Sequence, residues 1–239
     1  MKGFIIALQF LTRLPAPRMD VKGDNFPHAM RWFPAVGLVI GLILSGAAFT
    51  GSLIDPWTGA LAALVAWVLV TGALHLDGLS DLADASGAAH KDRERFLAVM
   101  ADPHVGSFGV VAIGLQLIAK IILLHGLIEA QAWAVLALIP FAARIGPLAW
   151  TRWLEPLHSG LAARFAKAIR LQDIIGWAAV LSASALIAPF ILIAPILIAL
   201  WGLWLHRALG GVSGDCHGAG IELVETGLLA ALLIGTRLL

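Results

Sequence analysis

The longest uncharged segment of the chain restricts the fold more than any other feature. Residues 174–205 contain no Asp, Glu, Lys or Arg, and Pro189 and Pro195 interrupt them. A continuous helix of this length, at about 1.5 Å per residue, would be much longer than one crossing of a bilayer core of roughly 30 Å. Because proline breaks helices, the segment is predicted to form two short spans, 174–189 and 192–208.

Several other stretches have the length and apolar character of a membrane span. The chain is 60% hydrophobic and 13% charged, whereas about a quarter of the residues in a soluble domain are charged. Residues 3–11 are too short to cross and are expected to lie at the interface as an amphipathic helix. We predict a single domain over residues 1–239, an all-α polytopic membrane helix bundle of about seven transmembrane helices; the remaining spans are 35–54, 58–76, 105–124, 132–150 and 223–239.

The positions of Lys and Arg predict the orientation, because basic loops favour the cytoplasmic side. With seven spans and a cytoplasmic N-terminus, the basic N-terminal stretch and the 77–104, 151–173 and 206–221 loops all face the cytoplasm. Six spans would place the 206–221 loop outside. A net charge of +1 gives no indication of nucleic-acid binding, and the single cysteine, Cys216, cannot form an internal disulfide.

Three aspartates follow the predicted span 58–76 directly. Asp77, Asp81 and Asp84 have the spacing i, i+4 and i+7, which puts them on one face of a helix. Carboxylates held this close repel one another unless a cation lies between them. All-oxygen ligands suit Mg²⁺ or Mn²⁺, so the pattern favours a metal site that binds phosphate over a solvated acidic loop.

Two glycine-containing segments lie in the same set of loops. Gly106 and Gly109 follow Asp102 and open the predicted span 105–124, an arrangement that serves either as a phosphate cradle or simply as a helix start. Asp215 and Glu222 are seven residues apart and would share a face if the last helix begins early. They would then add a second acidic group, and two metal ions could be bound, as phosphoryl transfer often requires.

Four basic residues are candidates for contact with substrate phosphates. Lys120 and Arg144 lie within predicted spans, where they bind substrate or pair with a carboxylate. Arg13 and Arg207 lie in loops, where binding to lipid headgroups is the alternative. His75 lies opposite Asp77 on the helix and is expected to form a hydrogen bond inside the bundle.

Four blocks in order resemble one family over nearly the whole chain. FLTRLPAP (10–17), HLDGLSDLADA (75–85), MADPHVGSFG (100–109) and LGGVSGDCHGAGIELVE (209–225) are similar to the cobalamin synthase family, the adenosylcobinamide-GDP ribazoletransferases. Ala85 stands where that family often has glycine, and Cys216 and His217 fill variable positions. The resemblance implies a bacterial inner-membrane enzyme that is Mg²⁺-dependent, with its active site facing the cytoplasm.

The resemblance also implies the reaction of late cobalamin biosynthesis. Adenosylcobinamide-GDP and α-ribazole, or its 5′-phosphate, are the implied substrates, and GMP is released. Membrane lipid is an expected partner, and assembly into a homo-oligomer is left open. The hypothesis gives the metal to Asp77, Asp81 and Asp84, with Asp215 and Glu222 as further ligands. It gives catalysis to Asp81, Asp215 and Asp102. It assigns substrate binding to Arg13, Gly106, Gly109, Lys120, Arg144 and Arg207.

Two other functions remain open at this point. A CDP-alcohol phosphotransferase also uses aspartates at a helix end, but its motif has an arginine shortly after the first Asp-Gly, and none follows Asp77-Gly78 here. A secondary transporter would relay ions through carboxylates and Lys120. Transporters often show repeated halves and acids near the midplane, whereas these acids gather at one face.

Overall fold

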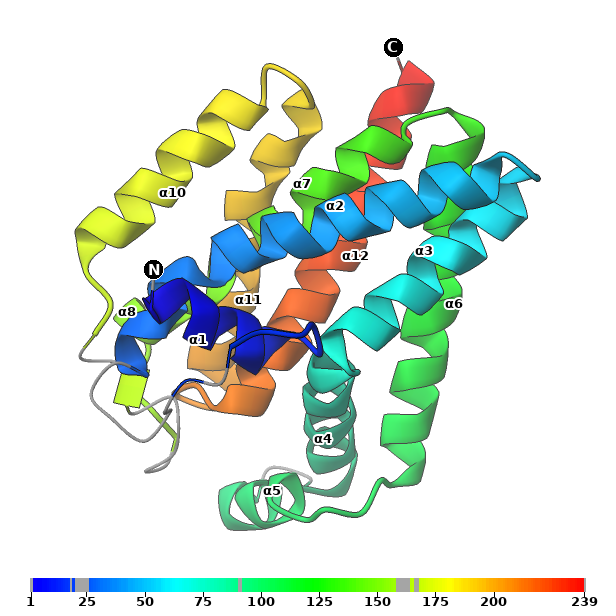
Figure 1. Cartoon of the computed structure of the whole chain (residues 1–239). Helices are drawn as coiled ribbons and strands as arrows, with labels where there is room; N and C mark the ends of the chain where they lie inside the picture. The colour runs from blue at the N-terminus through cyan, green and yellow to red at the C-terminus, as the bar shows by residue number, and fades with distance from the viewer. Residues whose placement is uncertain are drawn as a thin grey trace.

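The protein is a bundle of helices (Figure 1). The computed structural model describes residues 2–17, 19, 26–89, 92–157, 164–165 and 168–238, and within them the extended pairing is one isolated bridge between Pro156 and Val212. The α-helices are α1 Lys2–Leu11, α2 Phe33–Ser52, α3 Pro56–Thr71, α4 Leu74–Ala89, α5 Arg93–Met100, α6 Ser107–Glu129, α7 Leu138–Ala143, α8 Gly146–Trp153, α10 Leu171–Ser184, α11 Ala194–Ala208 and α12 Gly214–Leu238. The 3₁₀ helices are η1 Pro27–Trp32, η2 Trp133–Ala137 and η3 Pro189–Ile193.

The predicted membrane bundle is confirmed as a fold class, but the number of crossings differs from seven. Among the described residues, five helical segments are long and apolar enough to cross, and α3 with α4 would make a sixth if the bent pair is one span. The predicted span 174–189 corresponds to α10, which has only 14 residues. A crossing needs roughly 17 to 25. The cytoplasmic position of the N-terminus stays a prediction.

The prediction of one straight span over 58–76 is wrong. Helix α3 ends at Thr71, and α4 leaves it at an angle of 84°. Gly72 and Ala73 both adopt left-handed conformations, with φ of 60° and 59°, and their N–H groups bond back to carbonyls of the last turn of α3. A left-handed residue stops an α-helix, so the acid-bearing segment forms a helix of its own.

Helix α12 begins at Gly214, earlier than the predicted 223. The Ser213 hydroxyl accepts a hydrogen bond from the Cys216 N–H at 3.2 Å, which caps the helix start. Glycine then permits a close crossing with α4, because a Cβ on Gly78 would lie 2.8 Å from the Asp215 carbonyl oxygen. This crossing sets Asp215 directly against the helix that carries the three aspartates.

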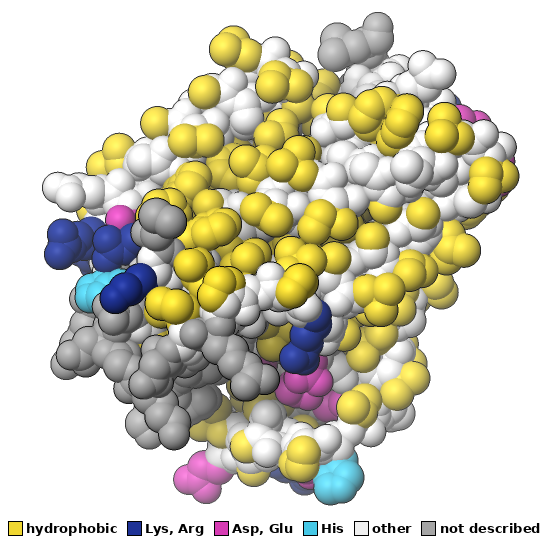
Figure 2. All heavy atoms as spheres, viewed as in Figure 1, with side chains coloured by type: hydrophobic (Ala, Val, Ile, Leu, Met, Phe, Trp, Pro, Cys, Tyr) yellow, Lys and Arg dark blue, Asp and Glu magenta, His cyan; other side chains and the backbone are white. Residues whose placement is uncertain are grey.

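The two ends of the bundle differ in their connections. In Figure 1 the α2–α3, α6–η2 and α10–η3 connections lie toward the end where the C-terminus is found. The α4–α5, α5–α6 and α11–α12 connections lie toward the opposite end. Hydrophobic side chains cover much of the face shown in Figure 2, as a lipid-exposed surface requires. Arg93 and Arg207, which come from two of the basic loops, line one hollow at the end that holds α4.

Candidate active site

Carboxylates from α4 and α12 meet at one recess in the surface. Asp77 is exposed, and Asp81 and Asp215 are half-buried. The negative charges of Asp77, Asp215 and Asp84 all act on Asp81. We call Asp77, Asp81 and Asp215 the acidic recess; acidic side chains gather beside basic ones in a hollow of the surface in Figure 2. The shared face expected for the three aspartates of α4 is confirmed, and the start of α12 at Gly214, earlier than predicted, brings in Asp215.

Asp84 lies on the same face, but its carboxylate is engaged by the protein. One oxygen accepts a hydrogen bond from the Gly106 N–H at 2.8 Å, and the other accepts one from the Gly109 N–H at 2.9 Å. The carboxylate therefore occupies the start of α6, where the helix dipole favours an anion. The cradle that the sequence suggested for a substrate phosphate already holds this internal carboxylate.

The absence of side chains at Gly106 and Gly109 makes that contact possible. A Cβ on Gly106 would lie 2.4 Å from one Asp84 carboxylate oxygen, and a Cβ on Gly109 would lie 2.2 Å from the Ser80 hydroxyl. Both distances are far shorter than van der Waals contact. These glycines thus allow α4 and α6 to approach, and their assignment as substrate-binding residues stays a prediction.

Asp102 forms a turn in front of α6. Its carboxylate accepts hydrogen bonds from the His104 N–H at 3.0 Å and lies 2.6 Å from the His104 Nδ1. These bonds, first the one from the backbone, lower the pKa of the exposed Asp102 carboxyl below its ordinary value. The expected catalytic role of Asp102 has no further support from these contacts.

The donor set of the acidic recess suits a magnesium ion shared with a substrate. Within the described residues, no three His, Cys, Asp or Glu side chains come close enough to hold a metal ion by themselves. Magnesium is usually bound in another way, by one or two carboxylates together with waters and phosphate oxygens. Like-charged oxygens near Asp81 would be stabilised by such a cation, so these residues fit Mg²⁺ that arrives with a phosphate group.

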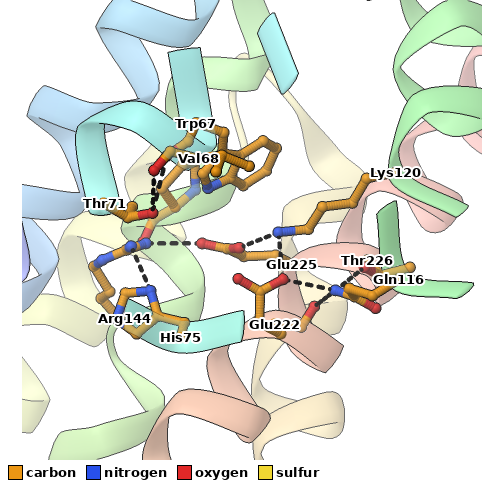
Figure 3. A network of polar contacts seen from close by, with 11 residues as sticks. Trp67, Val68, Thr71, His75, Gln116, Lys120, Arg144, Glu222, Glu225 and Thr226 are labelled. Carbon is orange, nitrogen blue, oxygen red and sulfur yellow. Dashed lines mark hydrogen bonds and ion pairs between the residues drawn. The ribbon is translucent and has the colours of Figure 1, made fainter. Parts of the chain in front are cut away.

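A second group of charged residues lies inside the bundle (Figure 3). Lys120 on α6 is 2% exposed, and its Nζ lies 2.7 Å from carboxylate oxygens of both Glu222 and Glu225 on α12. The same ammonium group lies 4.0 Å from the centre of the Trp67 ring. Because a charge in a membrane interior requires a partner, this pairing accounts for all three ionised residues.

Arg144 and His75 extend the group toward α4. The Arg144 guanidinium donates to the Glu225 carboxylate at 2.8 Å and lies 3.3 Å from the His75 Nδ1. The Gln116 amide donates to a Glu222 carboxylate oxygen at 2.9 Å. We call Gln116, Lys120, Arg144, Glu222, Glu225 and His75 the buried ion network; Figure 3 shows their side chains pointing toward one another.

The buried ion network bears on three assignments from the sequence. Lys120 and Arg144 are paired with glutamates, as the structural alternative expects, and their contact with substrate phosphate stays a prediction. Glu222 faces Lys120 deep in the bundle, and its role as a metal ligand stays a prediction. The expectation that His75 forms a hydrogen bond inside the bundle is confirmed.

Arg13 and Arg207 are both accessible, and Arg207 lies in the last turn of α11, not in the predicted loop. Arg13 is exposed, and its side chain lies against Gly72 at the bend between α3 and α4. Arg207 lines a hollow of about 320 Å³ together with Arg93 and His206, next to the glycines that precede α12. Both therefore lie beside segments that carry the acidic recess.

Sequence reasoning missed Glu225 as the central acid of the interior. It bonds to Arg144 and Lys120, which are 81 and 105 residues away. A signal was present, because Gln116 and Lys120 are four residues apart and Glu222 and Glu225 are three apart within apolar helices. Such pairs share a helix face, so they could have been matched to each other.

The family model and the most similar relatives that we compared agree with one another. The model of a family described as cobalamin-5-phosphate synthase matches residues 3–233. The chain is 66% identical to a protein named adenosylcobinamide-GDP ribazoletransferase from Novosphingobium aromaticivorans, over 98% of this chain and 97% of the relative. Proteins of the same name from Thiobacillus denitrificans and Brevibacillus brevis are 49% and 36% identical, over 100% and 98% of this chain and 96% and 98% of theirs. No solved structure matches.

Proposed function

The chain belongs to the cobalamin-5-phosphate synthase family, and from this we propose that it joins adenosylcobinamide-GDP to α-ribazole, or to its 5′-phosphate, with release of GMP. It is a transferase of cobalamin biosynthesis with several apolar helices suited to a membrane. One observation carries the assignment of the site: carboxylates from two helices, α4 and α12, meet in a recess at the end of the bundle where the glycine-rich connections lie.

The acidic recess suits transfer of a phosphate group. A bound Mg²⁺ would neutralise negative charge on the diphosphate and on the departing GMP. Asp77 and Asp81 are the residues proposed to hold it, since they are one helical turn apart and accessible. A recess of carboxylates alone would repel a diphosphate, so dependence on a divalent cation follows from this charge.

Asp215 is proposed to act on the nucleophile. A ribazole hydroxyl oxygen forms a bond to the phosphorus attached to cobinamide, the bond between that phosphorus and the GMP oxygen breaks, and the hydroxyl proton passes to a carboxylate. Asp215 comes from α12 and its charge acts on Asp81, so it is proposed to accept this proton from a hydroxyl held between the two helices.

The accessible arginines are proposed to receive the nucleotide end of the substrate. Arg207 and Arg93 line one hollow beside Gly210, and a guanidinium binds phosphate oxygens in pairs. Arg13 lies on the other side, at the start of α4. We assign this end of the bundle to the cytoplasmic side of the bacterial inner membrane, because Arg93 and Arg207 from two basic loops lie there.

A product assay tests the proposal. Purified protein in liposomes receives adenosylcobinamide-GDP, α-ribazole phosphate and Mg²⁺, and a parallel sample contains EDTA. We expect release of GMP with a cobalamin product only in the sample with Mg²⁺. Folded protein that releases no GMP would overturn the reaction, and equal release in EDTA would overturn the metal requirement alone. In the first case CDP-alcohol substrates are the next to be assayed.

A further inference from the structure

A cavity of about 170 Å³ opens between α1, η1 and the crossing of α4 with α12. We propose that it binds the aromatic base of the nucleoside substrate and selects a flat heterocycle that has an unprotonated ring nitrogen. This inference rests on the proposed function, because it assigns the base of the nucleoside substrate to one part of that same site.

One wall of the cavity is aromatic. Phe10, Phe33 and Phe165 line it, and their ring centres lie 5.8 to 6.5 Å from one another. Aromatic rings at such distances pack in stacked and edge-to-face arrangements and offer the same contacts to a further flat ring. This wall therefore favours an apolar aromatic group over a sugar or a phosphate.

The size of the cavity restricts the group to a small ring system. A cavity of about 150 Å³ with apolar walls is known to bind benzene. A space of about 170 Å³ therefore accepts one compact aromatic group but neither a corrin macrocycle nor a nucleoside diphosphate. The ribazole base, guanine and adenine are all this small, and the apolar aromatic wall favours the ribazole base because its ring carries the fewest polar groups.

His75, in the lining of the cavity, carries the hydrogen-bond donor of this proposal. His75 lines the cavity, and its Nδ1 faces the Arg144 guanidinium at 3.3 Å. A guanidinium only donates, so Nδ1 is the acceptor, and the ring proton of a neutral His75 lies on Nε2. The Nε2 atom is buried and has no hydrogen-bond partner among the described residues. Buried polar groups are normally satisfied, so an acceptor nitrogen on a bound base would supply the missing partner.

The position of the acids completes the arrangement. Asp77 and Asp215 of the acidic recess line the same cavity. A base held against the phenylalanines would therefore leave its ribose beside these carboxylates, where the attacking hydroxyl loses its proton. The buried ion network thus also affects binding of the base, because Arg144 fixes the tautomer of His75, which donates the hydrogen bond to it.

Binding of two nucleosides to the unaltered protein tests the inference without any need for turnover. Equilibrium dialysis in detergent compares benzimidazole riboside with indole riboside, in which a C–H group replaces the acceptor nitrogen. We expect the indole compound to bind about 5- to 10-fold more weakly, the effect of one hydrogen bond to a buried donor. Equal binding of the two compounds, or binding of neither, would overturn the inference.

A cavity-filling variant tests the location. Ile221 on α12 lines the cavity, so Ile221→Trp should fill it and weaken binding of benzimidazole riboside at least 10-fold. Ile234→Trp is the matched control, because that isoleucine is on the same helix and is 58% exposed. Binding that is unchanged in Ile221→Trp would place the base elsewhere. If Ile221→Trp does not fold, the comparison of the two nucleosides still decides.

Failure of this inference can be told apart from failure of the proposed function. If GMP is released but the indole riboside binds as well as the benzimidazole riboside, the reaction stands and the cavity assignment is wrong. If the benzimidazole riboside binds selectively and no GMP is released, the cavity assignment stands and the reaction is wrong.

Discussion

The acidic recess and the buried ion network use the same residue types in opposite ways. In the buried ion network two glutamates face one lysine and one arginine, so the charges balance within hydrogen-bonding distance. In the acidic recess the charges that act on Asp81 are those of other carboxylates. Both groups include residues of α12, a few helical turns apart.

The difference follows from where each group lies. A charge deep in a membrane protein is costly unless a partner is provided, so interior charges are balanced by the chain itself. Near the surface, water tolerates an excess of like charge, and that excess attracts a cation from outside. Balanced charge therefore indicates a role in the fold, whereas a gathered excess of one sign indicates binding.

Removal of charge from the acidic recess should have the largest effect on activity. We expect Asp81→Asn to lower the rate of GMP release by roughly 100-fold or more, because charge stabilisation at the reacting phosphate is lost. The melting temperature should stay the same or rise, since repulsion among carboxylates decreases. Product assay and thermal unfolding of the same sample measure both effects.

Glu94→Gln is the matched control for Asp81→Asn. Glu94 is an exposed acid in the first turn of α5, at the same end of the bundle. Its loss should change the rate less than about twofold, as is typical of surface substitutions away from a site. A similar loss of activity in both variants would mean that the acidic recess has no special role.

Glu225→Gln is expected to lower the stability of the protein, in contrast to Asp81→Asn. This change leaves Lys120 and Arg144 with Glu222 as the remaining carboxylate of the network, and loss of one partner from a buried ion group costs about 3–5 kcal/mol. Unfolding in detergent, followed by circular dichroism, should show the loss. The neutral double variant Lys120→Met with Glu222→Gln should be less destabilised than either single change.

An unchanged melting temperature in Glu225→Gln would contradict the idea that the buried ion network supports the fold. So would full additivity of the two changes in the double variant, because residues in one network are expected to be coupled.

Gly109→Ala tests the one aspartate of α4 that the protein itself engages. The added Cβ would lie 2.2 Å from the Ser80 hydroxyl and 2.4 Å from an Asp84 oxygen, so α4 must shift. We expect a loss of about 1–3 kcal/mol in stability, with a smaller loss of activity than for Asp81→Asn. Gly114→Ala on the same helix meets no atom within 4 Å and should be neutral or slightly stabilising. Equal melting temperatures for the two alanine variants would refute this account of Gly109.

The smallest effect is expected for the exposed ion pair at the far end of the bundle. Glu129 lies 3.3 Å from Arg237, with side chains 56% and 66% exposed. Glu129→Gln should change stability by less than about 1 kcal/mol, because water screens surface pairs. A loss comparable to that of Glu225→Gln would show that burial is not what distinguishes the two ion pairs.

The local pattern of the sequence predicted the parts of this molecule that depend on local spacing. The helical character and the common face of Asp77, Asp81 and Asp84 follow from residues within a few turns of one another, whereas the last span was predicted to begin at 223 and α12 begins at Gly214. The long-range contacts could not be predicted from the local pattern of the sequence. The partner of Lys120 depends on how α6 packs against α12, and the role of Gly109 depends on how closely α4 approaches α6.

The bend after α3 was missed for a related reason. Hydropathy continues from Val70 through Leu76, so a window of apolar residues reads as one span. What ends the helix is the left-handed conformation of Gly72 and Ala73, and an alanine gives no indication of it. Arg13, which packs against Gly72, comes from a distant part of the chain.

That bend has a consequence for how the chain enters the membrane during synthesis. An aspartate at the centre of an inserting helix costs about 2.5–3.5 kcal/mol, so three would cost roughly 8–10 kcal/mol. Segment Pro56–Thr71 carries no charged residue, and the corner that follows turns the three aspartates onto a separate helix. The insertion machinery can therefore admit the apolar arm without the helix that carries the three aspartates.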